Sequence, residues 1–225
     1  MRSMAETDSP GKTMKAHIVF AHPNLKSYNG ELRTIAIQTL KELGWSVSVS
    51  DLYQQKFKAS ADSDDFTHSC NPSFFDLQAE QKVASQHHTY STDIASEHKL
   101  LGEADLLIFQ FPLWWYSMPA LLKGYIDRVF SVGWAYGGGQ ALADKPLLVS
   151  TTTGAPEFAW TEDKRGTINE IFKHLFVGTF ELCGIQNLDP FVVYGAKRHS
   201  ENDRKAIFEL YKKRLTEIAM DLRPK

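Results

Sequence analysis

Three aromatic residues, Trp114, Trp115 and Tyr116, follow a strongly apolar run, Leu106 to Phe111, and a proline, Pro112. The apolar run predicts a fully buried strand, and the proline ends it because its ring fixes φ and leaves no N–H for a sheet ladder. Flat rings with polar edges suit a flat conjugated ligand that needs a floor. The alternative is that the tryptophans only fill a gap between a sheet and the next helix.

A second cluster, Ser27, Tyr28 and Asn29, begins an amphipathic helix after the short strand Lys15 to Ala21. Hydroxyl, amide and backbone N–H groups meet there, and the helix dipole adds partial positive charge, so a phosphate would be stabilised. The alternative is simple helix capping by Ser27 or Asn29, which needs no ligand. The sequence has no G-x-G-x-x-G after this strand and no P-loop lysine, which disfavours a dinucleotide fold or a nucleoside-triphosphate site.

A third cluster follows the strand Lys145 to Ser150, where Thr151 to Ala155 form a Thr-Gly turn. A turn of this kind after a buried strand exposes backbone N–H groups, which can hold the polar rim of a heterocycle. The alternative is that the turn only reverses the chain.

The elements that must position these clusters alternate along the chain. Apolar and period-two runs predict strands, and 3.6-residue periodicity predicts helices between them. The predicted strands are 15–21, 45–52, 106–111, 145–150 and 188–194, and the predicted helices end at Gly44, Leu101, Phe130, Gly184 and Leu222. This order predicts an α/β fold with a doubly wound, five-stranded parallel sheet in three αβα layers.

In such a sheet the three clusters lie at one edge, where a single ligand with a phosphate tail and a flat, polar-edged ring could use all of them. A flavin nucleotide is such a ligand. Two segments are less regular. Residues 56–92 show no clear element and predict an excursion anchored by Phe74, Phe75 and Leu77, and the helix 167–183 has almost no polar face, which favours burial against a second subunit.

Length and composition narrow the class. The 225 residues favour one domain, 15–225, after a flexible tail of residues 1–14 that has no apolar core and so does not resemble a secretory signal. A net charge of −2 with scattered Lys and Arg disfavours nucleic-acid binding. Cys70 and Cys183 match no metal spacing and fit a reducing, cytoplasmic location. The longest apolar stretch is interrupted by polar residues and prolines, so no membrane span is expected.

Several ordered motifs point to one family: QFPLWWYSMPALLKGYIDRVF, GWAYG, TTTGA and ELCGIQNLDPF. From about Lys15 to its end, the chain resembles the flavodoxin-like NAD(P)H:quinone oxidoreductases, the family of DT-diaphorase and its bacterial relatives. The resemblance implies a flavodoxin-like fold and a homodimer with the site at its interface. It also implies ping-pong transfer of two electrons as hydride from NAD(P)H through flavin N5 to a quinone.

The resemblance assigns roles to individual residues. Those that would bind the flavin are His22, Ser27, Tyr28, Asn29, Pro112, Leu113, Trp114, Trp115, Thr152, Thr153, Gly154 and Ala155. Asp127 and Arg204 fall where the family grips the adenosine end of FAD, which favours FAD over FMN. The alternative for this pair is a surface ion pair worth about 0–1 kcal/mol. The slot shared by nicotinamide and quinone would be lined by Trp115, Tyr116, Trp134 and Tyr136.

The sequence departs from the family beside the flavin. Where the mammalian enzymes have a Tyr and a His that stabilise the reduced flavin, this chain has Trp160 and then Arg165 or Gly166. Loss of one such donor typically lowers a rate by about 10² to 10³. We expect Arg165 and the amides of Gly154 and Ala155 to take that role, which makes these three and Trp160 the catalytic candidates.

Other departures and alternatives remain. Family members with a surface metal use two histidines, and the matching places here are Val177 and Glu181, so no metal is expected. QFPLWWYSMP and GWAYG also resemble flavin-binding ancillary proteins of bacterial potassium-efflux systems, although the long segment 56–92 favours a stand-alone reductase. A cofactor-free binding protein of the same shape is a third possibility. The sequence does not decide between NADH and NADPH or name the acceptor.

Overall fold

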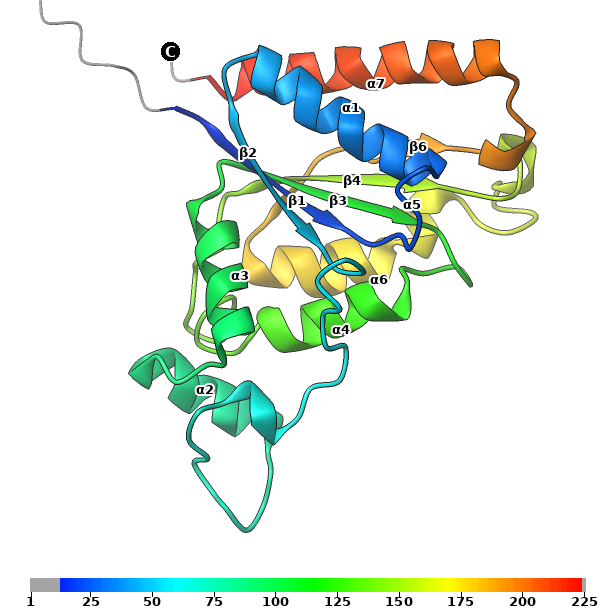
Figure 1. Ribbon diagram of the computed structural model, residues 1–225. Coiled ribbons are helices and arrows are strands. Elements are labelled where there is room, and N and C mark those ends of the chain that lie inside the picture. Colours follow the sequence, from blue (N-terminus) through cyan, green and yellow to red (C-terminus); the bar gives the residue numbers. More distant parts are fainter. Residues whose placement is uncertain (1–12, 224–225) are drawn as a thin grey trace, which may run out of the picture.

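The computed structural model describes residues 13–223 (Figure 1). The strands are β1 (Lys15–Phe20), β2 (Ser46–Asp51), β3 (Leu106–Pro112), β4 (Pro146–Thr152), β5 (Gln186–Asn187) and β6 (Phe191–Val193). The longer helices are α1 (Tyr28–Glu42), α2 (Leu77–His87), α3 (Thr92–Glu103), α4 (Ala120–Val129) and α7 (Glu201–Asp221). All strand pairs are parallel, in the order β2-β1-β3-β4-β5 with β6 also on β4. The predicted three-layer α/β fold is confirmed.

The apolar run in β3 is continuous because helices cover both faces of the sheet (Figure 1). Leu106 and Ile108 belong to the core under α1 and α7, whereas Leu107, Phe109 and Phe111 belong to the core under α3 and α4. Successive side chains of a strand point to opposite faces, so a central strand buried on both sides is apolar at nearly every position. The exception in β3 is the buried Gln110, which donates a hydrogen bond to Asn29.

The predicted fifth strand, 188–194, forms only in part, as β6, and the short β5 comes before it. β5 pairs with the beginning of β4 and β6 with its end, and residues 188–190 separate them. Pro190 has no N–H to offer a ladder, which explains why one continuous strand does not form there. Both pieces run parallel to β4, as the predicted parallel sheet requires.

The predicted helix 167–183 is not one regular helix. Thr167 and Glu170 form the expected capping box, but the segment then passes through α5 (Ile168–Ile171), α6 (Lys173–Leu175), a π-turn at Phe176–Phe180 and a 3₁₀ turn at Glu181–Cys183. Gly178 lies inside the π-turn, and a glycine weakens a helix interior. The expected burial on two sides is not met within one chain, since Val177 is 51% and Leu182 62% exposed.

Residues 56–92 do contain a helix that periodicity missed. Asp76 caps α2, and the positions that α2 buries include Glu80 and Gln81. Glu80 accepts hydrogen bonds from the Ser69 hydroxyl and the Cys70 N–H. The Gln81 side chain donates to the backbone carbonyl of Asp127 in α4 and accepts from the Val132 N–H just after it. Because polar residues occupy the buried face, the helix has no apolar stripe for sequence patterns to detect.

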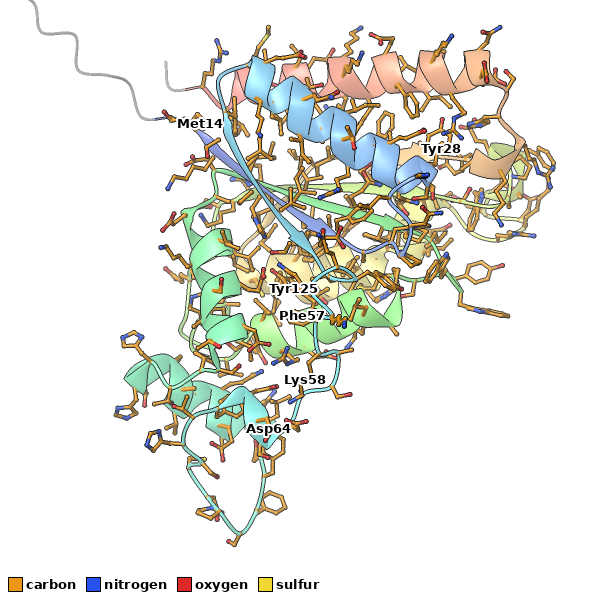
Figure 2. All side chains as sticks on the ribbon, viewed as in Figure 1. Met14, Tyr28, Phe57, Lys58, Asp64 and Tyr125 are labelled. Carbon is orange, nitrogen blue, oxygen red and sulfur yellow. The ribbon has the colours of Figure 1, made fainter. Side chains whose placement is uncertain are left out.

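The expected anchors of this segment are also wrong in part. Leu77 packs against the cluster that holds Phe66 and Tyr90, as expected. Phe74 is 68% and Phe75 42% exposed, however, and the buried anchors are Phe57, Phe66 and Tyr90. Figure 2 shows Phe57 beside Tyr125 of α4 at the start of the segment, with ring centroids 5.3 Å apart.

The predicted tail lies almost wholly outside the described residues. Met14 is an exception, because it packs against the core and its carbonyl accepts from the Ser46 N–H at 2.8 Å. Both cysteines are free, Cys70 exposed and Cys183 buried. No helix within residues 13–223 is long and apolar enough to cross a bilayer.

Stability should fall in mild acid because of His98. Its ring stacks on Trp134 at 3.8 Å, and its Nε2 lies 2.8 Å from the Val129 carbonyl. Burial lowers the pKa of His98 to about 4. The unfolded side chain, with a pKa near 6.5, therefore binds more protons, and the contribution is complete above pH 6.5 and lost as pH falls toward 4. From pH 7 to pH 5 we expect a loss of about 2 kcal/mol.

Urea unfolding at these two pH values measures this loss. His98→Gln, whose amide can still donate to the carbonyl, should remove most of the difference, whereas the same change at exposed His87 should not. An equal pH dependence in the wild type and the His98 variant would contradict the assignment.

Candidate functional site

The loops after β1, β3 and β4 meet at one edge of the sheet, as the strand order predicts, and enclose a pocket of about 500 Å³. We call it the basic pocket. Its lining residues are His22, Lys26, Ser27, Tyr28, Asn29, Pro112, Leu113, Trp114, Thr152, Thr153, Gly154, Ala196, Lys197 and Arg204. Ten of the predicted cofactor residues and Arg204 are therefore brought together. Lys26, Ala196 and Lys197 were missed.

One end of the basic pocket is the beginning of α1. The Ser27 side chain accepts from the Gly30 N–H at 3.1 Å, which confirms the predicted cap. The N–H groups of Tyr28 and Asn29 have no acceptor within residues 13–223. Nδ1 of His22 lies 3.0 Å from both the N and the O of Asn24, which leaves Nε2 free, and burial lowers the pKa of His22. These donors and the helix dipole fit a phosphate.

The Asn29 side chain bonds other protein side chains, whereas the sequence predicted that its amide helps to bind a phosphate. Its Nδ2 donates to Thr152 Oγ1 at 2.8 Å, and its Oδ1 accepts from Gln110 Nε2 at 2.8 Å. This buried chain of hydrogen bonds joins α1, β3 and β4 and holds the three loops in register. Its backbone N–H remains the group that can meet a ligand.

Three cationic side chains line the basic pocket: Lys26, Lys197 and Arg204. The Arg204 guanidinium lies 4.8 Å from the centre of the Tyr28 ring and 5.8 Å from that of Phe208, and it is paired with Glu31. Burial raises the pKa of Tyr28 to about 12, so its hydroxyl stays protonated. Lys26 and Lys197 make no ion pair within the described chain. No acidic residue lines the pocket, so it favours an anion.

A second cavity of about 380 Å³ adjoins the first, since Leu113 and Gly154 line both. We call it the aromatic pocket. It is lined by Leu113, Trp115, Tyr116, Gly154, Ala155, Trp160, Arg165 and Arg198. All four catalytic candidates and two of the predicted substrate residues lie here. Arg198 was missed because a single arginine after the fifth strand carries no motif.

The turn after β4 presents two free amides. Neither the Gly154 nor the Ala155 N–H has an acceptor within residues 13–223, whereas the Thr153 N–H donates to the Val193 carbonyl at 2.9 Å. The expectation that Thr153 supplies an N–H donor is therefore wrong. Trp160 is held here as well, because its Nε1–H donates to the Ala155 carbonyl at 3.2 Å and its ring meets Tyr116 edge-on.

The aromatic residues stand on a strained turn. Trp114 and Ser117 exchange backbone hydrogen bonds of 2.9 and 3.0 Å, and the central Trp115 and Tyr116 have φ of 49° and 60°. Left-handed backbone at a bulky residue costs roughly 1–2 kcal/mol. Trp115 is 95% exposed, so packing does not repay this strain in one chain. Strain that exposes a large ring points to a role in binding.

Replacing Trp115 with glycine should separate stability from binding. Glycine accepts this φ, so the free energy of unfolding should stay equal or rise by about 0.5–1 kcal/mol. The KM for an aromatic acceptor should rise up to about tenfold, because the ring contact is lost. Thermal unfolding and steady-state kinetics measure the two effects.

Trp114→Gly is the matched control. Trp114 has no positive φ and is more buried, so its loss should lower stability. A drop in stability for Trp115→Gly as large as that of the control would contradict the strain argument.

Three of the predicted site residues lie outside both pockets. Asp127 and Tyr136 line a separate cavity of about 290 Å³ beside α2 and α4, and Trp134 stacks on His98. Asp127 pairs with Lys123 on its own helix, not with Arg204. One chain therefore does not bring together Asp127 and Arg204, which were expected at the adenosine end of FAD. It also does not bring together the four residues expected to line the substrate slot.

Comparisons with known proteins agree with this geometry. A family model described as a flavodoxin-like fold matches residues 14–218. The chain is 38% identical over 212 residues to mouse ribosyldihydronicotinamide dehydrogenase [quinone], with 91% of each chain covered. It is 37% identical to guinea-pig NAD(P)H dehydrogenase [quinone] 1, covering 91% of this chain and 77% of the relative. A solved structure of a candidate quinone reductase from Klebsiella pneumoniae superposes with a TM-score of 0.88 at 33% identity, covering 92% and 85% of the two chains.

A shorter similarity concerns the regulatory alternative. The ancillary protein KefF of the glutathione-regulated potassium-efflux system of Enterobacter is 39% identical over 127 residues. This match covers 56% of this chain and 72% of that protein.

Proposed function

This chain belongs to the family with the flavodoxin-like fold, and from that premise we propose that it is a flavin-dependent NAD(P)H:quinone oxidoreductase. The observation that supports this most is the pair of adjoining pockets, one basic and one aromatic, that meet at Leu113 and Gly154. A flavin nucleotide has a charged tail and a flat ring, and the donors along these pockets match both parts.

The protein residues would divide the work of binding. The N–H groups at the start of α1, with Lys26 and Lys197, would bind phosphate oxygens, and His22 Nε2 would add a donor from a neutral ring. The free amides of Gly154 and Ala155 would hold the polar edge of the ring system. FAD suits the basic pocket better than FMN, since the three cationic side chains of Lys26, Lys197 and Arg204 exceed what one phosphate requires.

The flavin would supply the redox chemistry by accepting hydride from NAD(P)H and passing it to a quinone. Trp115, Tyr116 and Trp160 would orient a planar substrate in the aromatic pocket and exclude water from it. Arg165 would place positive charge near the ring edge where negative charge develops. Since one pocket serves donor and acceptor in turn, kinetics should be ping-pong.

We further propose that the enzyme works in the cytoplasm as a homodimer. Trp134 and Tyr136 lie away from the aromatic pocket of their own chain, and Asp127 lies away from Arg204, so a second copy would have to bring these residues to the site. The exposed Val177 and Leu182 offer apolar surface for such a contact. Sedimentation of the purified protein tests the oligomeric state.

The deciding experiment is an absorption spectrum of the purified protein, followed by chromatography of the released cofactor and anaerobic titration with NADPH. Bound flavin that NADPH bleaches and menadione reoxidises supports the proposal. A colourless protein that takes up neither FAD nor FMN would refute it.

The second candidate is a regulatory subunit of a potassium-efflux system, favoured by the local match to the Enterobacter protein. Quinone turnover by the isolated chain supports the reductase. Potassium efflux that requires this chain and survives loss of its turnover would support the regulatory role.

A further inference from the structure

The aromatic pocket carries two arginines, Arg165 and Arg198, and no acidic residue lines it. Arg128 and Arg204 are each paired with a carboxylate, but neither Arg165 nor Arg198 makes an ion pair within residues 13–223. Glu162 and Asp163 are close in sequence to Arg165, yet they do not line the pocket. The chain as a whole has a net charge of −2, so the positive charge of two unpaired guanidinium groups in this cavity does not follow from an excess of basic residues in the whole chain.

Both arginines are connected to the loop that carries Gly154 and Ala155. The Arg165 guanidinium lies 5.7 Å from the centre of the Trp160 ring, and Trp160 is hydrogen-bonded to the Ala155 carbonyl. Arg198 ends the 3₁₀ turn Ala196–Arg198, and its own N–H donates to the Gly195 carbonyl at 2.8 Å.

Gly195 fixes where this turn sits. It has a φ of 64°, and a Cβ on it would lie 3.3 Å from Pro156 Cα, so the turn packs closely on the loop after β4. Two further hydrogen bonds join the same segments: the Gly195 N–H donates to Thr153 Oγ1 at 3.2 Å and the Ala196 N–H to the Thr153 carbonyl at 3.0 Å. The turn is therefore anchored beside Gly154, although the arginine side chain itself is exposed.

We propose that Arg198, with Arg165, recognises an anionic group on the co-substrate that stacks in the aromatic pocket. This inference rests on the proposed function. The phosphates of the flavin would use the cations of the basic pocket, and Arg165 would face the edge of the flavin ring, which leaves Arg198 for a second ligand. Arg165 lies in the same cavity and adds to the positive charge that this ligand meets. That ligand contains a planar ring and an anionic group, which is a phosphate, a sulfonate or a carboxylate. Two sources carry this chemistry: the phosphates of NADH or NADPH, and an anionic quinone.

The test compares ligands that differ in charge, using flavin-loaded wild type, Arg198→Gln and Arg198→Lys. The donors are NADPH, NADH and the uncharged N-ribosyl dihydronicotinamide. The acceptors are anthraquinone-2-sulfonate and uncharged 2-hydroxymethylanthraquinone. KM is measured for each, and Kd of the two anthraquinones for the oxidised enzyme is measured by fluorescence quenching, which does not depend on turnover. Lys205→Gln is the control, an equal charge change at an exposed residue of α7 outside the pockets.

We expect Arg198→Gln to raise KM or Kd about threefold to tenfold for anionic ligands and to leave uncharged ones unchanged, with Arg198→Lys in between. Added salt should shrink the wild-type preference. A rise confined to NADH and NADPH assigns the anion to the donor, and a rise confined to anthraquinone-2-sulfonate assigns it to the acceptor. Equal effects on charged and uncharged ligands, or none on either, would overturn the inference while quinone turnover persists. Absence of flavin and of turnover would instead refute the proposed function.

Discussion

Replacing Arg128 with methionine is expected to lower the free energy of unfolding by about 3–5 kcal/mol. Arg128 is only 2% exposed, and its guanidinium donates to Asp65 Oδ1 from Nε at 3.0 Å and from Nη2 at 2.8 Å. It also bonds the Lys58 carbonyl and Asp93 and lies over the Phe57 ring. These contacts join α4 to the beginning of segment 56–92 and to α3, which follows the segment.

The loss is large because Asp65 is 1% exposed and would keep only Lys58 as a charged partner. Removing one member of a buried ion pair leaves an uncompensated buried charge. Urea unfolding followed by circular dichroism measures the effect, and faster proteolysis within residues 56–92 would locate it.

Lys123→Met is the matched control. It breaks an exposed ion pair with Asp127 on the same helix and should change stability by less than about 0.5 kcal/mol. A double variant, Arg128→Met with Asp65→Leu, should recover part of the loss, since it removes the stranded charge. A loss below about 1 kcal/mol for Arg128→Met would contradict the assignment of this cluster as the anchor of the segment.

Arg165→Ala is expected to slow flavin reduction by NADPH about 100-fold. A charge-stabilising donor at a reacting ring typically contributes 10² to 10³ in rate, and Arg165 shares the aromatic pocket with the free amides of Gly154 and Ala155. Stopped-flow absorbance of the oxidised flavin measures this step apart from quinone reduction. The amount of bound flavin should stay unchanged, because the residues proposed to hold its phosphates lie in the basic pocket.

Arg165→Lys keeps the charge and should recover part of the rate. Lys164→Ala is the control, since Lys164 is exposed and donates to the Phe158 carbonyl without lining the aromatic pocket. Flavin reduction at the wild-type rate in Arg165→Ala would refute the role of Arg165 and leave the two amides as the only candidates.

The sequence determined the parts of this protein that depend on local chemistry and on burial of whole strands. The apolar run in β3 predicted a central strand, and the order of strands predicted the sheet edge at which three loops meet. Ser27 predicted the cap of α1, because a capping side chain and its N–H lie within one turn of helix. Ordered motifs predicted the family.

Only the tertiary structure decided how distant residues share the site. Arg198 enters the aromatic pocket because the backbone of Gly195 and Ala196 bonds Thr153, a contact across more than forty residues that leaves no local pattern. The same holds for α2, whose buried face is polar and satisfied by partners from other segments. Asp127 and Trp134 lie outside both pockets of their own chain, because contacts with α2 and His98 determine their positions. Side chains whose partners are far away in sequence are placed by packing and hydrogen bonds, which residue type and spacing do not encode.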